Sequence, residues 1–196
     1  RSLELDAVSE VPRYYVCNAY GVCGIYSAPG TAVKEAYDTS GIVTNDRGVT
    51  VWLKGNRVSR NQIMAIKEES VTEQKNSLAV CLDNILRHAG ITRNTEYDLA
   101  QGKTATTILS ENMTGVQVLD LSGCTLDAVL YYVNQDIPVL AILEDGEAVL
   151  VTGFNEFNVV IMEPATGKLY KKGMNDATAW FAENGNHFIT YMRTEN

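Results

Sequence analysis

Hydrophobic residues are densest between positions 137 and 164, where three short runs are separated by polar turns. The runs are rich in Val, Ile and Leu, and the breaks are Glu144-Asp145-Gly146 and Asn155-Glu156-Phe157. Apolar runs of this length, joined by an Asp-Gly turn and an Asn-containing turn, are typical of antiparallel strands. Because the runs are nearly continuous in apolar character, we expect both faces of the sheet to be covered. The stretch therefore predicts a β-meander at the core of the larger domain.

The first 60 residues follow another pattern, in which short apolar strands flank a single helix. One hairpin is predicted around Asn18–Gly21 and a second around Asn45–Gly48, and a helix is predicted at Thr31–Tyr37 between them. The order predicts a small ββαββ module over residues 1–60.

From residue 61 onward, helical and strand periodicities alternate around the meander. Apolar residues three and four positions apart predict helices, whereas shorter apolar runs predict strands. The expected helices are 62–70, 78–89, 105–112, 125–134 and 176–183, and the further strands are 116–121, 168–174 and 187–192. Residues 91–104 are expected to form a polar connection. The sequence thus predicts an α+β chain with a second domain at 61–196.

Charge is unevenly distributed along the chain. Residues 1–70 carry 8 basic and 8 acidic side chains, whereas residues 71–196 carry 8 basic and 16 acidic ones. An acidic domain without a cluster of Lys and Arg is a poor match for a phosphate backbone, so nucleic acid is not an expected partner. No apolar run approaches the length of a membrane span. No cofactor is expected.

The four cysteines are Cys17, Cys23, Cys81 and Cys124. None forms a Cys-x-x-Cys pair and the chain has two histidines, so a structural zinc site is not expected. If the first hairpin closes on its predicted turn, Cys17 and Cys23 lie opposite one another. They are then either a cross-strand disulfide or two small apolar residues of a strand. The even cysteine count, with Arg1 rather than Met at the start, is the basis for expecting an extracellular or cell-surface bacterial protein.

Three segments together carry a resemblance to a known family. A helix ends at Gly90, Pro138-Val139 opens a strand, and Ala148–Phe154 is followed by Glu163–Gly167. On these segments, residues 72–193 resemble papain-like cysteine peptidases of the bacterial type that trims double-glycine leader peptides. The resemblance implies a papain-like domain with a central antiparallel sheet. It also implies a nucleophilic Cys at the start of the first helix, a His before the second segment and an Asp before the Pro of the third.

None of these three catalytic residues is present at the matching position. The family's Cys falls on Ser77, its His on Glu147 and its Asp on Glu163, and the nearest match to an oxyanion-hole Gln is Gln74, at a different spacing. A thiolate nucleophile needs an adjacent imidazole, and a Ser-Glu-Glu set offers no base near neutral pH unless burial strongly raises one carboxylate pKa. Ser77 is therefore expected to act as a helix N-cap. Gln74, Ser77 and Glu147 are the residues expected to line a substrate-binding groove.

The two glutamates could face each other across neighbouring strands. Glu147 and Glu163 would then share a proton, bind a cation or sit apart in solvent. Hard cations require several oxygen ligands, and two carboxylates are too few to predict a calcium site. No metal site is therefore expected.

A relocated catalytic site is the alternative to a lost one. Cys81 lies on the apolar stripe of its helix, which favours a buried core position. Cys124, beside Gly123 at the start of a helix, is better placed for a low thiol pKa, and its alternatives are a core position or a buried contact with Cys81. His187 would be the partner imidazole, while His88 is expected to cap the C-terminus of its helix.

Three functions follow from this sequence. The favoured one is a non-catalytic peptidase-like domain of a secreted or surface bacterial protein, which binds an extended peptide or protein in the old cleft. The second is an active cysteine peptidase or other hydrolase with an unconventional Cys–His site. The third is a structural spacer domain in a larger surface protein.

Overall fold

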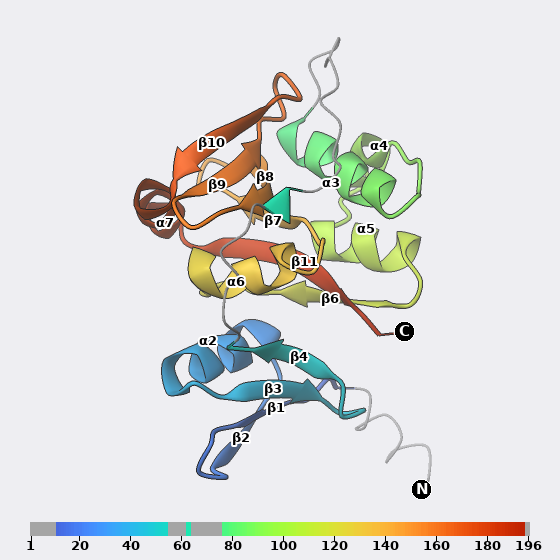
Figure 1. Ribbon diagram of the computed structural model, residues 1–196. Helices are drawn as coiled ribbons and strands as arrows, with labels where there is room; N and C mark the ends of the chain where they lie inside the picture. Colours follow the sequence, from blue (N-terminus) through green and yellow to red (C-terminus); the bar gives the residue numbers. More distant parts are fainter. Residues whose placement is uncertain (1–10, 55–61, 64–75, 195–196) are drawn as a thin grey trace, which may run out of the picture.

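Two antiparallel sheets organise the chain, as Figure 1 shows. The computed structural model describes residues 11–54, 62–63 and 76–194. Within this part of the chain, an N-terminal module combines a four-stranded sheet with one helix, and five helices accompany the larger sheet. The α+β class expected from the sequence is confirmed.

The module has the expected ββαββ order. Its elements are β1 (Tyr14–Cys17), β2 (Cys23–Tyr26), α2 (Pro29–Thr39), β3 (Ile42–Asn45) and β4 (Thr50–Leu53). The strands lie in the order β2-β1-β3-β4, and each neighbouring pair is antiparallel. Helix α2 begins two residues before its predicted start at Thr31, because Pro29 occupies the first turn, where a missing N–H leaves no intrahelical bond unmade.

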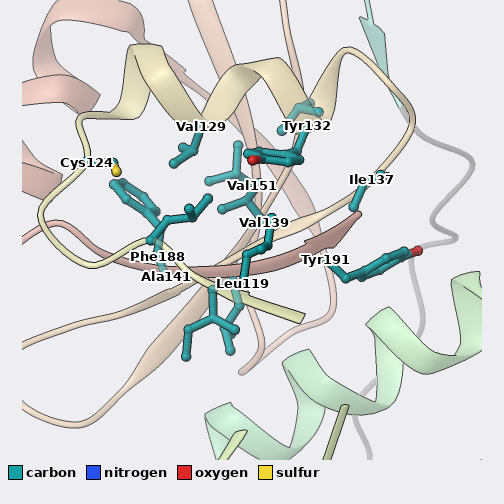
Figure 2. Packing of buried hydrophobic residues seen from close by; sticks show 14 of the residues in the cluster. Leu119, Cys124, Val129, Tyr132, Ile137, Val139, Ala141, Val151, Phe188 and Tyr191 are labelled. Atoms are coloured by element: carbon teal, nitrogen blue, oxygen red, sulfur yellow. The ribbon is translucent and has the colours of Figure 1, made fainter. Parts of the chain in front are cut away.

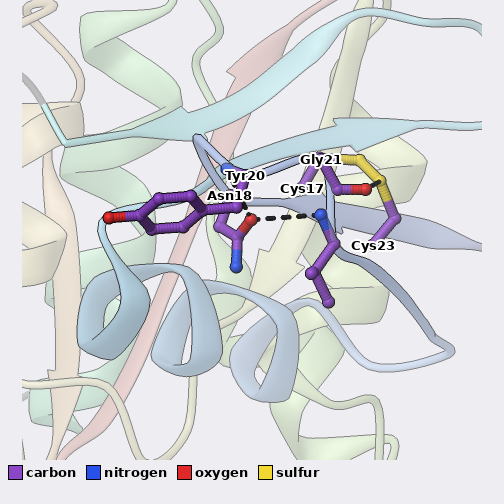
Figure 3. The surroundings of a disulfide bond; sticks show 6 residues. Cys17, Asn18, Tyr20, Gly21 and Cys23 are labelled. Atoms are coloured by element: carbon purple, nitrogen blue, oxygen red, sulfur yellow. Dashed lines mark hydrogen bonds between the residues drawn. A yellow bond between two sulfur atoms is a disulfide. The ribbon is translucent and has the colours of Figure 1, made fainter.

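A disulfide between Cys17 and Cys23 closes the first hairpin (Figure 3). The two residues pair directly across β1 and β2, with Cα atoms 4.2 Å apart. At the tip, Asn18 Oδ1 accepts hydrogen bonds from the backbone N–H groups of Tyr20 (2.9 Å) and Val22 (3.1 Å). Of the two alternatives that the sequence left open for Cys17 and Cys23, the disulfide is the one found.

The larger sheet contains the predicted meander. Its strands are β5 (Gln62–Ile63), β6 (Val116–Asp120), β7 (Val139–Ile142), β8 (Ala148–Phe154), β9 (Asn158–Met162), β10 (Leu169–Gly173) and β11 (His187–Arg193). The order is β10-β9-β8-β7-β11-β6, and β5 pairs with β8. Strands β7, β8 and β9 are consecutive and antiparallel, with Leu140 opposite Leu150 and Leu150 opposite Met162. The meander is confirmed.

The helices of the larger domain agree with the predicted ones except at two places. They are α3 (Ser77–His88), α4 (Thr95–Ala100), α5 (Ala105–Asn112), α6 (Leu126–Val133) and α7 (Met174–Glu183). The helix predicted at 62–70 is wrong at its first two residues, because Gln62–Ile63 pairs with the end of β8 as a strand. The rest of that predicted helix lies outside the described residues.

Helix α4 lies within 91–104, a segment predicted to be irregular. It is held by polar contacts rather than by an apolar stripe. The buried Asp83 carboxylate of α3 accepts hydrogen bonds from the Thr95 N–H (2.8 Å) and hydroxyl (2.7 Å). Two further bonds join the Arg93 guanidinium to the Asp98 carboxylate, at 3.0 and 2.8 Å. Hydrophobic periodicity does not reveal this helix, because the contacts that hold it are made by polar side chains and one of them comes from a different helix.

Strand β8 is the centre of the larger core. All seven of its residues are buried, and α3 and α6 both pack against it. Figure 2 shows Val129 and Tyr132 of α6 directed at the sheet, next to Val139 and Val151. The expectation that both faces of the meander are covered is therefore confirmed.

The module packs against α6. The Trp52 indole N–H donates to the Ala128 carbonyl at 2.9 Å, and the Tyr132 hydroxyl donates to the Val51 carbonyl at 2.9 Å. All four residues are buried. The predicted domain boundary after residue 60 stays a prediction, because the residues around it lie outside the described part of the chain.

Candidate functional site

The start of α3 meets the start of β8. Ser77 is the first residue of α3 and is half-buried, and its Oγ accepts a hydrogen bond from the Ala148 N–H at 2.9 Å. The N-cap is Asn76, whose side-chain oxygen accepts from the Leu78 N–H at 2.9 Å. The expectation that Ser77 caps the helix is therefore wrong, because Asn76 fills that position and leaves the Ser77 hydroxyl to face the strand.

Glu147 is brought to this corner by the β7–β8 turn. Its N–H donates to Asp145 Oδ1 at 2.9 Å, and its carbonyl accepts from the Leu143 N–H at 2.8 Å. These bonds fix the backbone of Glu147 directly before Ala148, while its side chain is exposed. Ser77 accepts this hydrogen bond and Glu147 directly precedes its donor, although the two residues are 70 positions apart in the sequence.

Glu163 follows β9 at the same end of the sheet. Its backbone pairs with the start of β10, since its N–H donates to the Lys168 carbonyl at 2.9 Å. Because Leu150 pairs with Met162, the next position on β9 puts Glu163 beside Val149, two residues from Glu147. The side chains of Glu147 and Glu163 are both exposed.

The predicted groove residue Gln74 lies outside the described residues. Among the residues that are described, no group of three or more His, Cys, Asp or Glu is placed to hold a metal ion. Within the same part of the chain, no helix is long and apolar enough to cross a membrane.

The two free cysteines, Cys81 and Cys124, are both buried. Cys81 is 0% exposed on the inner face of α3, and burial raises the pKa of its thiol. Cys124 is 1% exposed, and its thiol donates to the Gly30 carbonyl at 3.2 Å. Burial is the main cause that raises the Cys124 pKa to about 12. Both sites disfavour the thiolate that a nucleophilic cysteine requires.

The two histidines contact carboxylates and a backbone carbonyl. His187 Nε2 lies 3.9 Å from Asp120 Oδ1. His88 is the last residue of α3, but the C-cap is Ala89, so the expected capping role is wrong. The His88 Nε2 lies 3.1 Å from the Asp136 carbonyl oxygen and 3.5 Å from the Asp136 carboxylate. No contact among the described residues joins either imidazole to a sulfur atom.

Sequence reasoning missed Asn76 as the cap and Ala148 as the partner of Ser77. A usable signal existed for the first, since Asn is a preferred N-cap and directly precedes the helical stretch. None existed for the second, because the bond joins a side chain to a backbone N–H in a distant strand.

Comparison with solved structures identifies the fold. A crystal structure of a protein from Bacillus anthracis, described as a C39-like peptidase, superimposes with a TM-score of 0.59 at 13% identity, covering 70% of this chain and 100% of that one. No family model and no curated protein sequence matches the chain. At this identity the likeness establishes the fold alone, which is the papain-like fold that C39-like peptidases share.

Proposed function

We propose that this papain-like domain is non-catalytic and holds an extended peptide at the corner formed by α3 and β8. The proposal depends on the peptidase-like fold together with the occupant of position 77. There, a Ser Oγ accepts the Ala148 N–H at 2.9 Å, in the place where the resemblance puts a nucleophilic thiol.

The chemistry of the corner supports binding rather than peptide hydrolysis. A hydroxyl becomes a nucleophile when an adjacent base removes its proton, and the position expected for the base holds Glu147 with an exposed carboxylate. Carboxylates at Glu147 and Glu163 would also repel the oxyanion that forms on a peptide carbonyl. The two free thiols, Cys81 and Cys124, are buried in the core.

The same charges favour a basic peptide. Glu147 and Glu163 are exposed at one end of the sheet, in a domain whose residues 71–196 carry 16 acidic against 8 basic side chains. Carboxylates in such a position attract Lys and Arg side chains and speed their association. Peptides with a central Lys or Arg are therefore the expected ligands.

Fluorescence anisotropy with labelled heptapeptides of central Lys, Ser or Glu tests the proposal. The Lys peptide should bind most tightly, and Glu147→Lys should weaken it at least about tenfold. Glu156→Lys is the matched control, because it makes the same charge change in the turn at the other end of β8. An equal loss in both variants would contradict a site at the corner, and no binding by any peptide would favour a spacer.

Incubation of the same peptides with the chain, followed by mass spectrometry, tests the absence of catalysis. Intact peptides are expected. Cleavage that disappears in Cys81→Ala or Cys124→Ala would instead establish the unconventional peptidase.

We also propose that the protein works outside the cytoplasm, on the bacterial surface or in secreted form. The Cys17–Cys23 disulfide supports this location, since exposed disulfides persist in oxidising compartments. Thiol quantification on protein isolated from its native host should find the Cys17–Cys23 disulfide intact. Four reduced cysteines would contradict this location.

A further inference from the structure

The sheet of the module has one face on the core and one in solvent. Its register places Cys23, Cys17, Ile42 and Leu53 in one row across the four strands, with Ile25 in the next row. Ile25, Ile42 and Leu53 are 64%, 47% and 37% exposed. We call these five residues the outer face. An exposed, contiguous apolar surface on a folded domain commonly marks an interaction site.

A pocket of about 400 Å³ continues the outer face near the start of β1 and the end of β3. It is lined by Val11, Arg13, Tyr15, Asp46 and Arg47, and Tyr15 pairs directly with Ile25 of the outer face. Among the described residues, no acidic side chain lies within ion-pair distance of either guanidinium. Two guanidiniums against one carboxylate make the pocket positive in an otherwise acidic chain, and guanidiniums pair well with carboxylates.

Both ends of this surface are held in place before any partner arrives. At the pocket, the buried Asn45 accepts hydrogen bonds from the Arg47 N–H (3.0 Å) and the Val49 N–H (2.9 Å). The Asn45 amide in turn donates to Gln117 of β6 at 3.3 Å. At the other end, the disulfide and the Asn18 side chain fix the hairpin, as Figure 3 shows. A surface ordered in advance loses little entropy on binding.

We propose that the outer face and its pocket form a docking surface for an extended, acidic and apolar segment of a partner protein. Apolar side chains of the segment would cover Ile25 and Ile42, while a carboxylate would lie between Arg13 and Arg47. The two guanidiniums, which form no ion pair among the described residues, select an acidic segment over a basic one. This surface is separate from the corner at Glu147 and opposite in charge, so it does not depend on the proposed function.

The test uses a fluorescein-labelled octapeptide of alternating Leu and Asp, with Leu-Lys and Leu-Ser octapeptides as analogues. Anisotropy on the full chain should show the Leu-Asp peptide binding at least about tenfold tighter than either analogue. The double variant Arg13→Glu, Arg47→Glu should weaken it at least about tenfold, and Ile42→Ser should weaken it several-fold. Lys171→Glu, a charge reversal on the exposed part of β10, should change it less than about twofold.

Equal binding of the three peptides, or no binding at millimolar concentration, would overturn the proposal. So would a loss in Lys171→Glu equal to that in the arginine variant. The alternative is that the outer face binds a second copy of the chain, and sedimentation equilibrium tests it. A dimer that dissociates in Ile42→Ser would assign the face to a second copy and overturn the proposal. Glu147→Lys is expected to leave binding of the Leu-Asp peptide intact, which separates failure here from failure at the corner.

Discussion

The hydrogen bond from Tyr132 to Val51 gives a way to measure how much the contact between the module and α6 contributes to the free energy of unfolding. Val51 lies at the register shift of the β3–β4 pair, where Val43 pairs with Trp52 and Thr44 with Thr50. Val51 therefore has no partner in the β3 register, and the Tyr132 hydroxyl of α6 binds its carbonyl at 2.9 Å.

Tyr132→Phe should destabilise the chain markedly. Tyr132 and Val51 are 0% and 1% exposed, so water cannot replace the lost donor. A buried carbonyl left without its partner costs about 1–3 kcal/mol of unfolding free energy. For a chain of this size that corresponds to a fall in Tm of roughly 2–12 °C.

Urea unfolding followed by tryptophan fluorescence and far-UV circular dichroism measures this change. Tyr191→Phe is the matched control, because Tyr191 is 3% exposed and its hydroxyl makes no hydrogen bond among the described residues. The control should shift stability by less than about 0.5 kcal/mol. Equal effects in the two variants would refute the assignment of the stabilisation to the Val51 bond.

Three further outcomes are expected. Gly30→Ala should lower the free energy of unfolding in urea by about 1–3 kcal/mol, because a Cβ would come within 2.7 Å of the Ser122 carbonyl oxygen. Unchanged stability would mean that α2 moves away from Ser122 at no cost, and would contradict this expectation. Cys81 and Cys124 should react with a thiol-specific dye only after unfolding, since both are buried, and labelling of the native chain at neutral pH would contradict this. Burial raises the pKa of Tyr132 well above 10.0, so the folded state keeps this proton more tightly than the unfolded chain. Its stabilisation is therefore complete below about pH 10 and is lost as pH rises further; a stability curve that stays flat from about pH 9 to 12 would be inconsistent with it.

The sequence predicted the elements whose apolar residues recur at a regular period. The meander and the helix at 105–112 agree with the structure because their own side chains form the core. Helix α4 was missed because Asp83 and Arg93 hold it by polar contacts, and β5 because its pairing is to the end of β8. Periodicity reports burial along one segment and carries no information on such cross-chain partners.

The sequence indicated which positions come together but not how their side chains are oriented. The family resemblance pointed to Ser77, Glu147 and Glu163, and the structure places all three near the same end of β8. The direction of the Ser77 hydroxyl depended on whether the cap was residue 76 or 77. That choice is made by a single hydrogen bond, which the Asn76 side chain accepts from the Leu78 N–H and which helix propensity does not resolve.

Rebuilding a nucleophile at position 77 tests whether this corner is the equivalent of a peptidase site. Ser77→Cys puts a half-exposed thiol at the first residue of α3, where the partial positive charge of the helix N-terminus lowers a thiol pKa. The Ala148 N–H would then face the sulfur and stabilise the thiolate further. Alkylation by iodoacetamide at neutral pH should be faster than that of a cysteine in an unstructured peptide.

Adding Glu147→His to Ser77→Cys should sharpen the effect, because an imidazolium beside the sulfur favours the thiolate. The midpoint of the pH–rate profile for alkylation should fall by about one unit or more relative to Ser77→Cys alone. Ser77→Cys with Glu156→His is the control, since it adds an imidazole in the turn at the far end of β8. If both histidine variants gave the same midpoint, position 147 would not face position 77 as a base faces its nucleophile. The absence of catalysis would then have to be explained by the geometry of the corner rather than by its side chains.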